Sequence, residues 1–353
     1  MNRRIEYRQV AYILSLFLIV QFGGILLTTA FLLPAQAPIT TQNLNTTISG
    51  GGPMSVLWLV LYLVIGTIVV IMISRVYHGD VILRLLEAYV IIAASFFVFF
   101  VVLITFFPQQ NLLIPVSVAS VLIGVAIVFA KMRFPQVRNF AAVIASIGVG
   151  MTLGYYFPFA SAWLLMGIIA IYDYVAVFVT KHMITLAKAV SSRNLAFLIG
   201  SSDVEVIPKK YLSASEEKEI RKTINTREIK SPVIKRLVRE GKLPVLSQVQ
   251  LGAGDLGIPL MLSVSAYTTF LSFFTANMLI AGACAGLLLT MTVLRKYQVP
   301  LPAIPPLYAS MNFALAIATA VTGILPITWV GIFAGVGVLT LVPMYYALTR
   351  GRS

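Results

Sequence analysis

Long apolar segments alternate with short polar ones along almost the whole chain. A bilayer core about 30 Å thick is crossed by a helix of roughly 20 apolar residues, and these segments have that length. Glycines and prolines, among them Gly52-Pro53, Pro108, Pro158 and Pro326, mark the turns between them. The pattern predicts ten transmembrane helices, over residues 10–33, 55–74, 88–107, 112–130, 140–157, 160–180, 249–274, 277–294, 303–323 and 326–348.

The composition places the protein in the membrane class. Of its 353 residues, 59% are hydrophobic and 11% are charged, whereas a soluble domain has roughly 25% charged residues. The predicted fold class is therefore all-α, a polytopic transmembrane helical bundle. One long polar segment divides it into a six-span N-terminal bundle (1–180), a cytoplasmic loop (181–248) and the C-terminal spans (249–353).

The loop 181–248 carries fourteen basic and seven acidic residues. Ser231 and Pro232 suit the start of a helix and Gly241 suits its end, which predicts a short helix over 232–240. Its apolar face opposite lysine and arginine is typical of a helix on an anionic membrane surface, so membrane lipid is an expected partner. For the rest of the loop, a flexible solvated linker is the alternative.

The basic residues predict how the chain is oriented in the membrane. With the N-terminus inside, all 26 lysines and arginines fall in segments on one side of the predicted spans, and the loops on the other side have no charged residue. Because cytoplasmic segments are enriched in lysine and arginine, the N-terminus, the loop 181–248 and the C-terminus are predicted to be cytoplasmic. This distribution accounts for the net charge of +14, and no nucleic-acid-binding motif accompanies it.

The sequence indicates no metal or cofactor. Cys284 is the one cysteine, and His78 and His182 are the only histidines, both outside the predicted spans. The HExxH motif of membrane zinc proteases is absent. Nothing in the sequence indicates an obligatory partner subunit.

Two aspartates are the candidates for chemistry. Ten of the twelve acidic residues fall in predicted cytoplasmic segments, and only Asp173 and Asp255 fall in spans, without a lysine or arginine there. A charged group inside a membrane costs several kcal/mol, so such residues usually serve a function. Asp173 comes eight residues before Lys181, about 12 Å along a helix. Asp255 follows the loop by a similar length on the next span, so the two are predicted to lie at one depth.

Two carboxyl groups at close range cannot both ionise easily, so they share one proton. The ionised carboxylate can take a proton from water, and the protonated one can donate to a peptide carbonyl oxygen. This is the division of labour in aspartic proteases, and the pair titrates as a unit.

Glycines and prolines near these aspartates suggest how a site is shaped. Gly252, Gly254 and Gly257 surround Asp255, where missing side chains let backbones approach and loosen the helix. Ordinary helix packing is the alternative for these glycines. The prolines from Pro302 to Pro306 favour extended backbone in the residues before them, so this strip is a candidate for pairing with an extended substrate. The alternative is a proline cluster that begins the ninth span.

Three short motifs together resemble those of a known family. Tyr172-Asp173, Gly252-Ala253-Gly254-Asp255 and Pro302-Ala303-Ile304-Pro305 are similar to the YD, GxGD and PALP motifs of presenilins and signal peptide peptidases, in the family's order and on the matching spans. Tyr172 to Phe178 is closer to presenilins, whereas Asp255 to Pro259 is closer to signal peptide peptidases. Two features depart from the family: Ile304 replaces leucine, and presenilins have nine spans rather than ten.

The resemblance implies an intramembrane aspartyl protease with Asp173 and Asp255 as its catalytic pair. It implies that Tyr172, Gly252, Gly254 and the strip of Pro302, Ala303, Ile304 and Pro305 shape the site or position substrate. The predicted direction of the sixth span matches presenilins, so the implied substrates are single-span membrane proteins with an outside N-terminus. The short termini and loop resemble a prokaryotic, archaeal homologue in the cell membrane.

Three other functions compete with this interpretation. A proton-coupled transporter also uses intramembrane aspartates and glycine-broken helices, but no internal symmetry is evident here. A prepilin-type peptidase shares a GxGD motif, but the lysine that follows its aspartate is absent. A non-catalytic scaffold leaves two aspartates at matched depth unexplained.

Overall fold

The structure is a computed structural model that describes residues 7–32, 61, 81–134, 137–179, 198–208, 242–297 and 302–350. The chain forms two compact units. One consists of residues 1–13 with 200–250, and the other, which we call the helical unit, consists of residues 14–199 with 251–353. Each unit is described by itself.

The described residues form nine α-helices, which confirms the predicted all-α membrane bundle. Seven of these helices are long and apolar enough to cross a membrane, and the apolar part of α14 is shorter, Thr328–Met344. The second predicted span, 55–74, and the predicted helix at 232–240 lie outside the described residues, except for Leu61. The helices are α1 (Tyr7–Leu32), α4 (Val81–Phe106), α5 (Leu113–Arg133), α6 (Val137–Tyr156), α7 (Phe159–Tyr174), α11 (Ala253–Phe270), α12 (Phe273–Tyr297), α13 (Ile304–Thr322) and α14 (Thr328–Arg350).

Most helix boundaries differ from the predicted ones by a few residues, and two of the differences change the place of an acidic residue. The third helix begins at Val81 rather than at residue 88, so Arg84 and Glu87 lie within α4. The seventh begins at Ala253 rather than at residue 249, because residues up to Gly252 belong to a strand and Gly252 keeps extended backbone at the start of α11. Asp255 therefore lies in the first turn of its helix.

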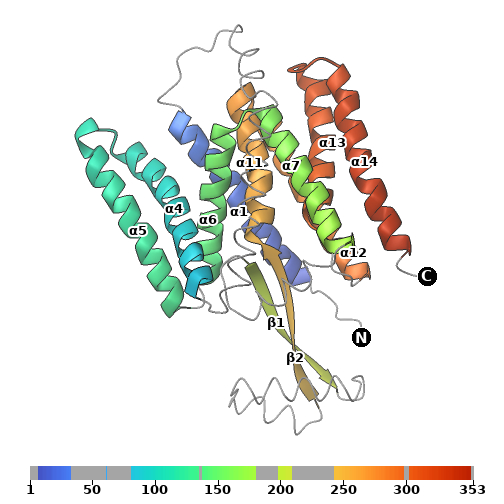
Figure 1. The fold of residues 1–353 in the computed structure, drawn as a ribbon, viewed down its shortest axis with the longest axis horizontal. Coiled ribbons are helices and arrows are strands. Elements are labelled where there is room, and N and C mark those ends of the chain that lie inside the picture. The colour runs from blue at the N-terminus through green and yellow to red at the C-terminus, as the bar shows by residue number, and fades with distance from the viewer. Residues whose placement is uncertain are drawn as a thin grey trace. The chain divides into compact units, whose positions relative to one another are not determined.

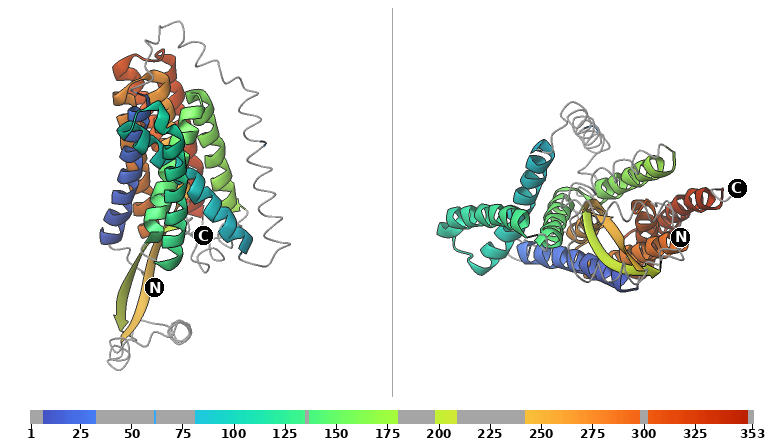
Figure 2. Two further views of the ribbon diagram at one scale, coloured as in Figure 1. Left: turned by 90° about the vertical axis from the view of Figure 1, so that its left-hand side faces the viewer. Right: turned by 90° about the horizontal axis from the view of Figure 1, so that it is seen from below.

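Helix α11 lies at the centre of the helical unit. It contacts α6, α7 and α12, and most of its residues from Leu256 to Thr269 are buried. Figure 1 shows α6 and α7 beside α11, with α4 and α5 beyond α6, and α13 and α14 beyond α7. In the end-on view of Figure 2, α4 and α5 again lie on the opposite side of α11 from α14. Helix α11 has apolar residues on every side, and such a helix is usually buried among others.

Small residues let α11 and α6 approach closely. A Cβ atom added to Gly150 of α6 would lie 2.7 Å from the carbonyl oxygen of Gly257, and one added to Gly154 would lie 2.6 Å from that of Met261. Gly282 and Gly286 of α12 meet the backbone of α13 in the same way. Membrane helices associate through such contacts, because lipid removes most of the hydrophobic driving force between them.

The structure contains one two-stranded sheet among the described residues, formed by β1 (Leu198–Pro208) and β2 (Lys242–Gly252). The sequence did not predict these strands. Both lie within or at the edge of the predicted cytoplasmic loop, so about a quarter of that segment is strand rather than linker.

Candidate active site

Asp255 is the third residue of α11, directly after the end of β2. Its Oδ2 accepts a hydrogen bond of 3.2 Å from the backbone N–H of Gly252. This is one half of a capping box, in which an acidic side chain at the third helical position accepts a hydrogen bond from the backbone N–H of the N-cap residue. A Cβ atom at Gly252 would lie 3.1 Å from Oδ2 of Asp255, so the glycine gives the carboxyl its space.

Asp173 is the last residue but one of α7. A π-helical turn, η3 (Val175–Val179), follows directly after the end of α7 at Tyr174. Such turns often occur at functional sites. Its Oδ2 accepts a hydrogen bond of 3.2 Å from the backbone N–H of Ile304, the first residue of α13. The N–H of Ala303 also faces this carboxyl. A carboxylate at the N-terminus of a helix meets unpaired donors and the positive end of the helix dipole.

These contacts bring the three sequence motifs together. The charge of Asp173 acts on Asp255, so the two carboxyl groups are near each other. Ile304, from the proline-containing motif, contacts Asp173, and Gly252, from the glycine motif, contacts Asp255. Each carboxyl group therefore has one oxygen fixed by a backbone N–H.

The other predicted site residues lie around this pair. Tyr172 is 51% exposed, on the outer side of α7. Gly254 is exposed, and a Cβ atom there would meet nothing closer than Ile258 at 3.9 Å. Pro302, Ile304 and Pro305 are buried. Ala303 has helical backbone, with φ −86° and ψ −34°, so the prolines begin α13 and the strip is not extended here.

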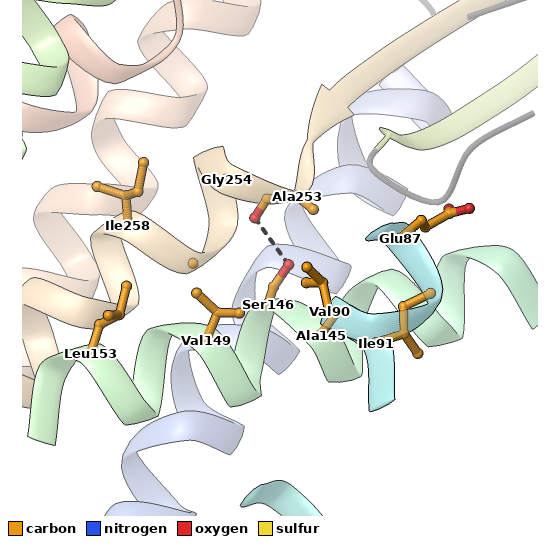
Figure 3. Close-up of a pocket in the computed structure, with 11 residues that line it drawn as sticks. Glu87, Val90, Ile91, Ala145, Ser146, Val149, Leu153, Ala253, Gly254 and Ile258 are labelled. Atoms are coloured by element: carbon orange, nitrogen blue, oxygen red, sulfur yellow. Dashed lines mark hydrogen bonds between the residues drawn. The ribbon is translucent and has the colours of Figure 1, made fainter. Parts of the chain in front are cut away.

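An apolar pocket adjoins the turn that carries Asp255. It has a volume of about 160 Å³ and is lined by residues of α4, α6 and α11, Ala253 and Gly254 among them. Figure 3 shows Ser146 of α6 reaching the backbone of Ala253, where its Oγ donates a hydrogen bond of 3.0 Å to the carbonyl oxygen. The pocket can hold an apolar side chain beside the first turn of α11.

Glu87 was missed as an intramembrane carboxyl, because the third helix was predicted to begin after it. It is 3% exposed and forms an ion pair with Lys131 of α5. Glu87 therefore differs from the two aspartates, for which the described residues supply no basic partner. The signal was present in the sequence, since apolar residues continue on the N-terminal side of Glu87.

Metal ligands do not gather in the part of the chain that the structure describes. No three side chains of histidine, cysteine, aspartate or glutamate come together there in a way that could hold an ion. Among the acidic residues that the structure describes in helices, Glu87 is paired with Lys131, whereas no ion pair of Asp173 or Asp255 is found there.

The chain is similar to known proteins in sequence and in fold. Residues 14–324 match the family described as signal-peptide peptidase, presenilin aspartyl protease. The fold is similar to two solved structures of a presenilin family intramembrane aspartate protease. One, in space group C222, has a TM-score of 0.53 and 16% identity, and the other, in space group P2, has a TM-score of 0.55 and 18% identity. Each alignment covers 88% of this chain and 97% of the solved one. No curated protein sequence matches the chain.

The family match includes both aspartates and the proline-containing motif, and it ends before α14 begins at Thr328. It confirms the resemblance and decides for an intramembrane aspartic endopeptidase over a transporter. As such an enzyme, the protein acts on membrane protein substrates. The chain belongs to the signal-peptide peptidase and presenilin family of intramembrane aspartyl proteases.

Proposed function

We propose that Asp173 and Asp255 are the catalytic pair of this protease. The observation that carries the proposal is that two carboxyl groups lie at the adjoining ends of α7 and α11, near enough for one charge to act on the other. The described residues give neither carboxyl a basic partner that would hold it ionised. One proton shared by the pair provides an acid and a base at the same place.

In the proposed reaction, the ionised carboxylate removes a proton from water as the water oxygen attacks the peptide carbonyl carbon. The protonated carboxyl donates its proton to the carbonyl oxygen, which gives a neutral tetrahedral intermediate. When the C–N bond breaks, the carboxyl that took the proton from water donates it to the leaving nitrogen. The other carboxylate takes a proton from a hydroxyl of the intermediate, so the pair again holds one proton and each carboxyl is back in its starting state. The backbone N–H groups of Gly252 and Ile304 hold one oxygen of each carboxyl and leave the other to act.

Both hydrogen bonds also fit a purely structural role, in which each aspartate caps a helix. Asparagine distinguishes the two roles, because its side-chain oxygen still accepts a backbone N–H but it supplies no acid or base. We expect Asp173→Asn and Asp255→Asn to keep the unfolding temperature near that of wild type and to abolish cleavage of a single-span reporter peptide. Cleavage by either variant at the wild-type rate would show that its carboxyl is only a cap.

We also propose that the substrates are single-span membrane proteins whose N-terminus is outside, and that the N-terminus, the loop 181–248 and the C-terminus are cytoplasmic, in a prokaryotic cell membrane. The lysine and arginine distribution supports this orientation. Paired reporters with the same span in opposite orientations test it in cells. Preferential cleavage of the reporter with its N-terminus inside would overturn it.

Positioning of substrate by Tyr172, Gly252, Gly254 and the strip of Pro302, Ala303, Ile304 and Pro305 stays a prediction. Because Ala303 has helical backbone, the strip does not offer an extended segment to a substrate in this structure. We propose instead that the backbone N–H of Ile304 orients the Asp173 carboxyl. The apolar pocket beside Ala253 and Gly254 suits the side chains of a transmembrane substrate.

A further inference from the structure

A buried amide of the first helix reaches the turn that carries Asp255. Gln21 of α1 is 0% exposed. Its Nε2 donates a hydrogen bond of 3.0 Å to the backbone carbonyl oxygen of Leu256, the residue after Asp255. The two residues are 235 positions apart in the sequence, so this contact joins the first helix directly to the catalytic turn.

The approach of α1 to α11 is built into the packing. Gly24 lies one turn after Gln21, and a Cβ atom there would overlap the side chain of Leu260. A larger residue at Gly24 would push α1 away and would take the Gln21 amide out of reach. The hydrogen bond therefore depends on a close helix contact of the kind that small residues permit in membranes.

The first turn of α11 has less internal support than an ordinary helix. Pro259 lies within α11, and a proline has no N–H to donate to the carbonyl oxygen four residues earlier, which here is that of Asp255 itself. Side chains of other helices hold the carbonyl oxygens on either side of that of Asp255. Ser146 of α6 donates to the carbonyl oxygen of Ala253 (Figure 3), and Gln21 of α1 donates to that of Leu256.

Gln21 is a costly residue for mere packing. Its Oε1 is buried and has no hydrogen-bond partner in the part of the chain that the structure describes. A buried polar atom without a partner costs about 1–3 kcal/mol. Methionine has a similar volume and would fill the same space without that cost, so packing does not explain the glutamine.

We propose that Gln21 is a positioning residue for Asp255: its side-chain amide fixes the first turn of α11 and so the place of the carboxyl. The proposal rests on the proposed catalytic pair. A misplaced carboxyl slows the chemical step more than it weakens substrate binding, because a shift of about 1 Å can cost about 100-fold in rate. The loss therefore falls on kcat, with KM unchanged.

Gln21→Met tests the proposal in the full-length protein with a single-span reporter peptide. We expect kcat to fall at least about tenfold, KM to stay the same, and the unfolding temperature to stay the same or rise, since an unpartnered buried oxygen is removed. Gln21→Glu is the conservative rescue, because a protonated glutamic acid has the same length and donates through its O–H. Its rate relative to wild type at the same pH should exceed that of Gln21→Met, and the excess should grow as the pH is lowered.

Thr28→Val is the matched control. Thr28 is buried in the same helix, but its hydroxyl donates to the carbonyl oxygen of Gly24 within α1. Loss of this bond should leave kcat unchanged.

Two results would overturn the proposal. One is a wild-type kcat for Gln21→Met. The other is a fall in kcat together with a clear fall in unfolding temperature, with neither restored by Gln21→Glu, because a purely structural role predicts that result. Asp255→Asn, measured beside them, separates this failure from that of the catalytic pair: if it cleaves, the proposed function itself has failed.

Discussion

The two aspartates are held in different ways. Asp255 begins a helix that is buried on nearly every side, and its turn is fixed by contacts from α1 and α6. Asp173 ends a helix whose outer face is open, with Ile171 65% exposed and Tyr172 51% exposed. Its carboxyl is fixed by the first turn of α13, and a π-helical turn follows it.

Both close packing and hydrogen bonds tie the Asp173 side to its neighbours. A Cβ atom added to Gly167 of α7 would lie 2.9 Å from the hydroxyl oxygen of Tyr308 in α13. Trp163 of α7 donates from Nε1 to Oδ1 of Asn312 in α13, at 2.8 Å. The hydroxyl of Tyr174 donates to the carbonyl oxygen of Pro343 in α14, at 3.3 Å. The difference between the two sides is which helices support each aspartate: the place of Asp255 depends on α1 and α6, and that of Asp173 on how α13 and α14 pack against α7.

The largest expected effect comes from the packing that supports Asp255. Gly150→Val would drive a side chain into the backbone of Gly257, where a Cβ atom has only 2.7 Å. Overpacking of this kind costs about 1–3 kcal/mol and sometimes more, so both the unfolding temperature in detergent and the cleavage rate should fall strongly. Gly331→Val is the control, because nothing lies within 4 Å of a Cβ atom there. Equal unfolding temperatures for the two variants would contradict the close contact of α6 with α11.

An intermediate effect is expected when the donor to Asp173 is removed. Ile304→Pro deletes the N–H at the first position of α13, where proline is otherwise well accepted. A hydrogen bond to a charged group is worth about 1.5–3 kcal/mol, so kcat should fall roughly 10- to 100-fold. Proline disfavours the helical backbone of Ala303 before it, so the unfolding temperature is measured in parallel.

Ile304→Leu serves as the control for this change, because it keeps the N–H and restores the residue of the related families. Its kcat should stay close to that of wild type. If Ile304→Pro and Ile304→Leu cleave equally fast, the N–H of residue 304 has no part in orienting Asp173.

The smallest effect is expected at the contact with α14, the helix beyond the family match. Tyr174→Phe removes a long hydrogen bond from a partly exposed hydroxyl, which is worth less than about 1 kcal/mol. The cleavage rate should change by no more than about fivefold. A much larger loss would show that α14 takes part in placing Asp173 and contributes more to the site than this single hydrogen bond indicates.

The sequence predicted the helices and the catalytic candidates because both depend on local properties. Runs of about 20 apolar residues are sufficient to indicate spans, and an aspartate within such a run is conspicuous, as Asp173 and Asp255 were. The ends of helices were less certain. Glu87 lies inside α4 because its pairing with Lys131 allows an acidic residue to be buried, and a pairing between helices is not visible in a hydropathy pattern.

Other features depend on tertiary contacts that short sequence patterns do not encode. The strands β1 and β2 are 33 residues apart along the chain and were not predicted. The sequence made the proline strip a candidate for pairing with an extended substrate, whereas in the structure it begins α13 and the N–H of Ile304 binds Asp173. Gln21 is one of two glutamines in a helix of 26 residues, and only the contact with Leu256 connects it with the site. A buried polar residue in an apolar span was the one signal available for it.

The central claim is that Asp173 and Asp255 act as one catalytic unit. The most direct test is the cleavage rate of a single-span reporter by wild type, Asp173→Asn, Asp255→Asn and the double variant, all purified in the same detergent. Groups that act as a unit are not additive, so each single variant should fall to the same residual rate as the double variant. A single variant that keeps an intermediate rate, with a further loss in the double variant, would show that the two carboxyls contribute independently and would contradict the account.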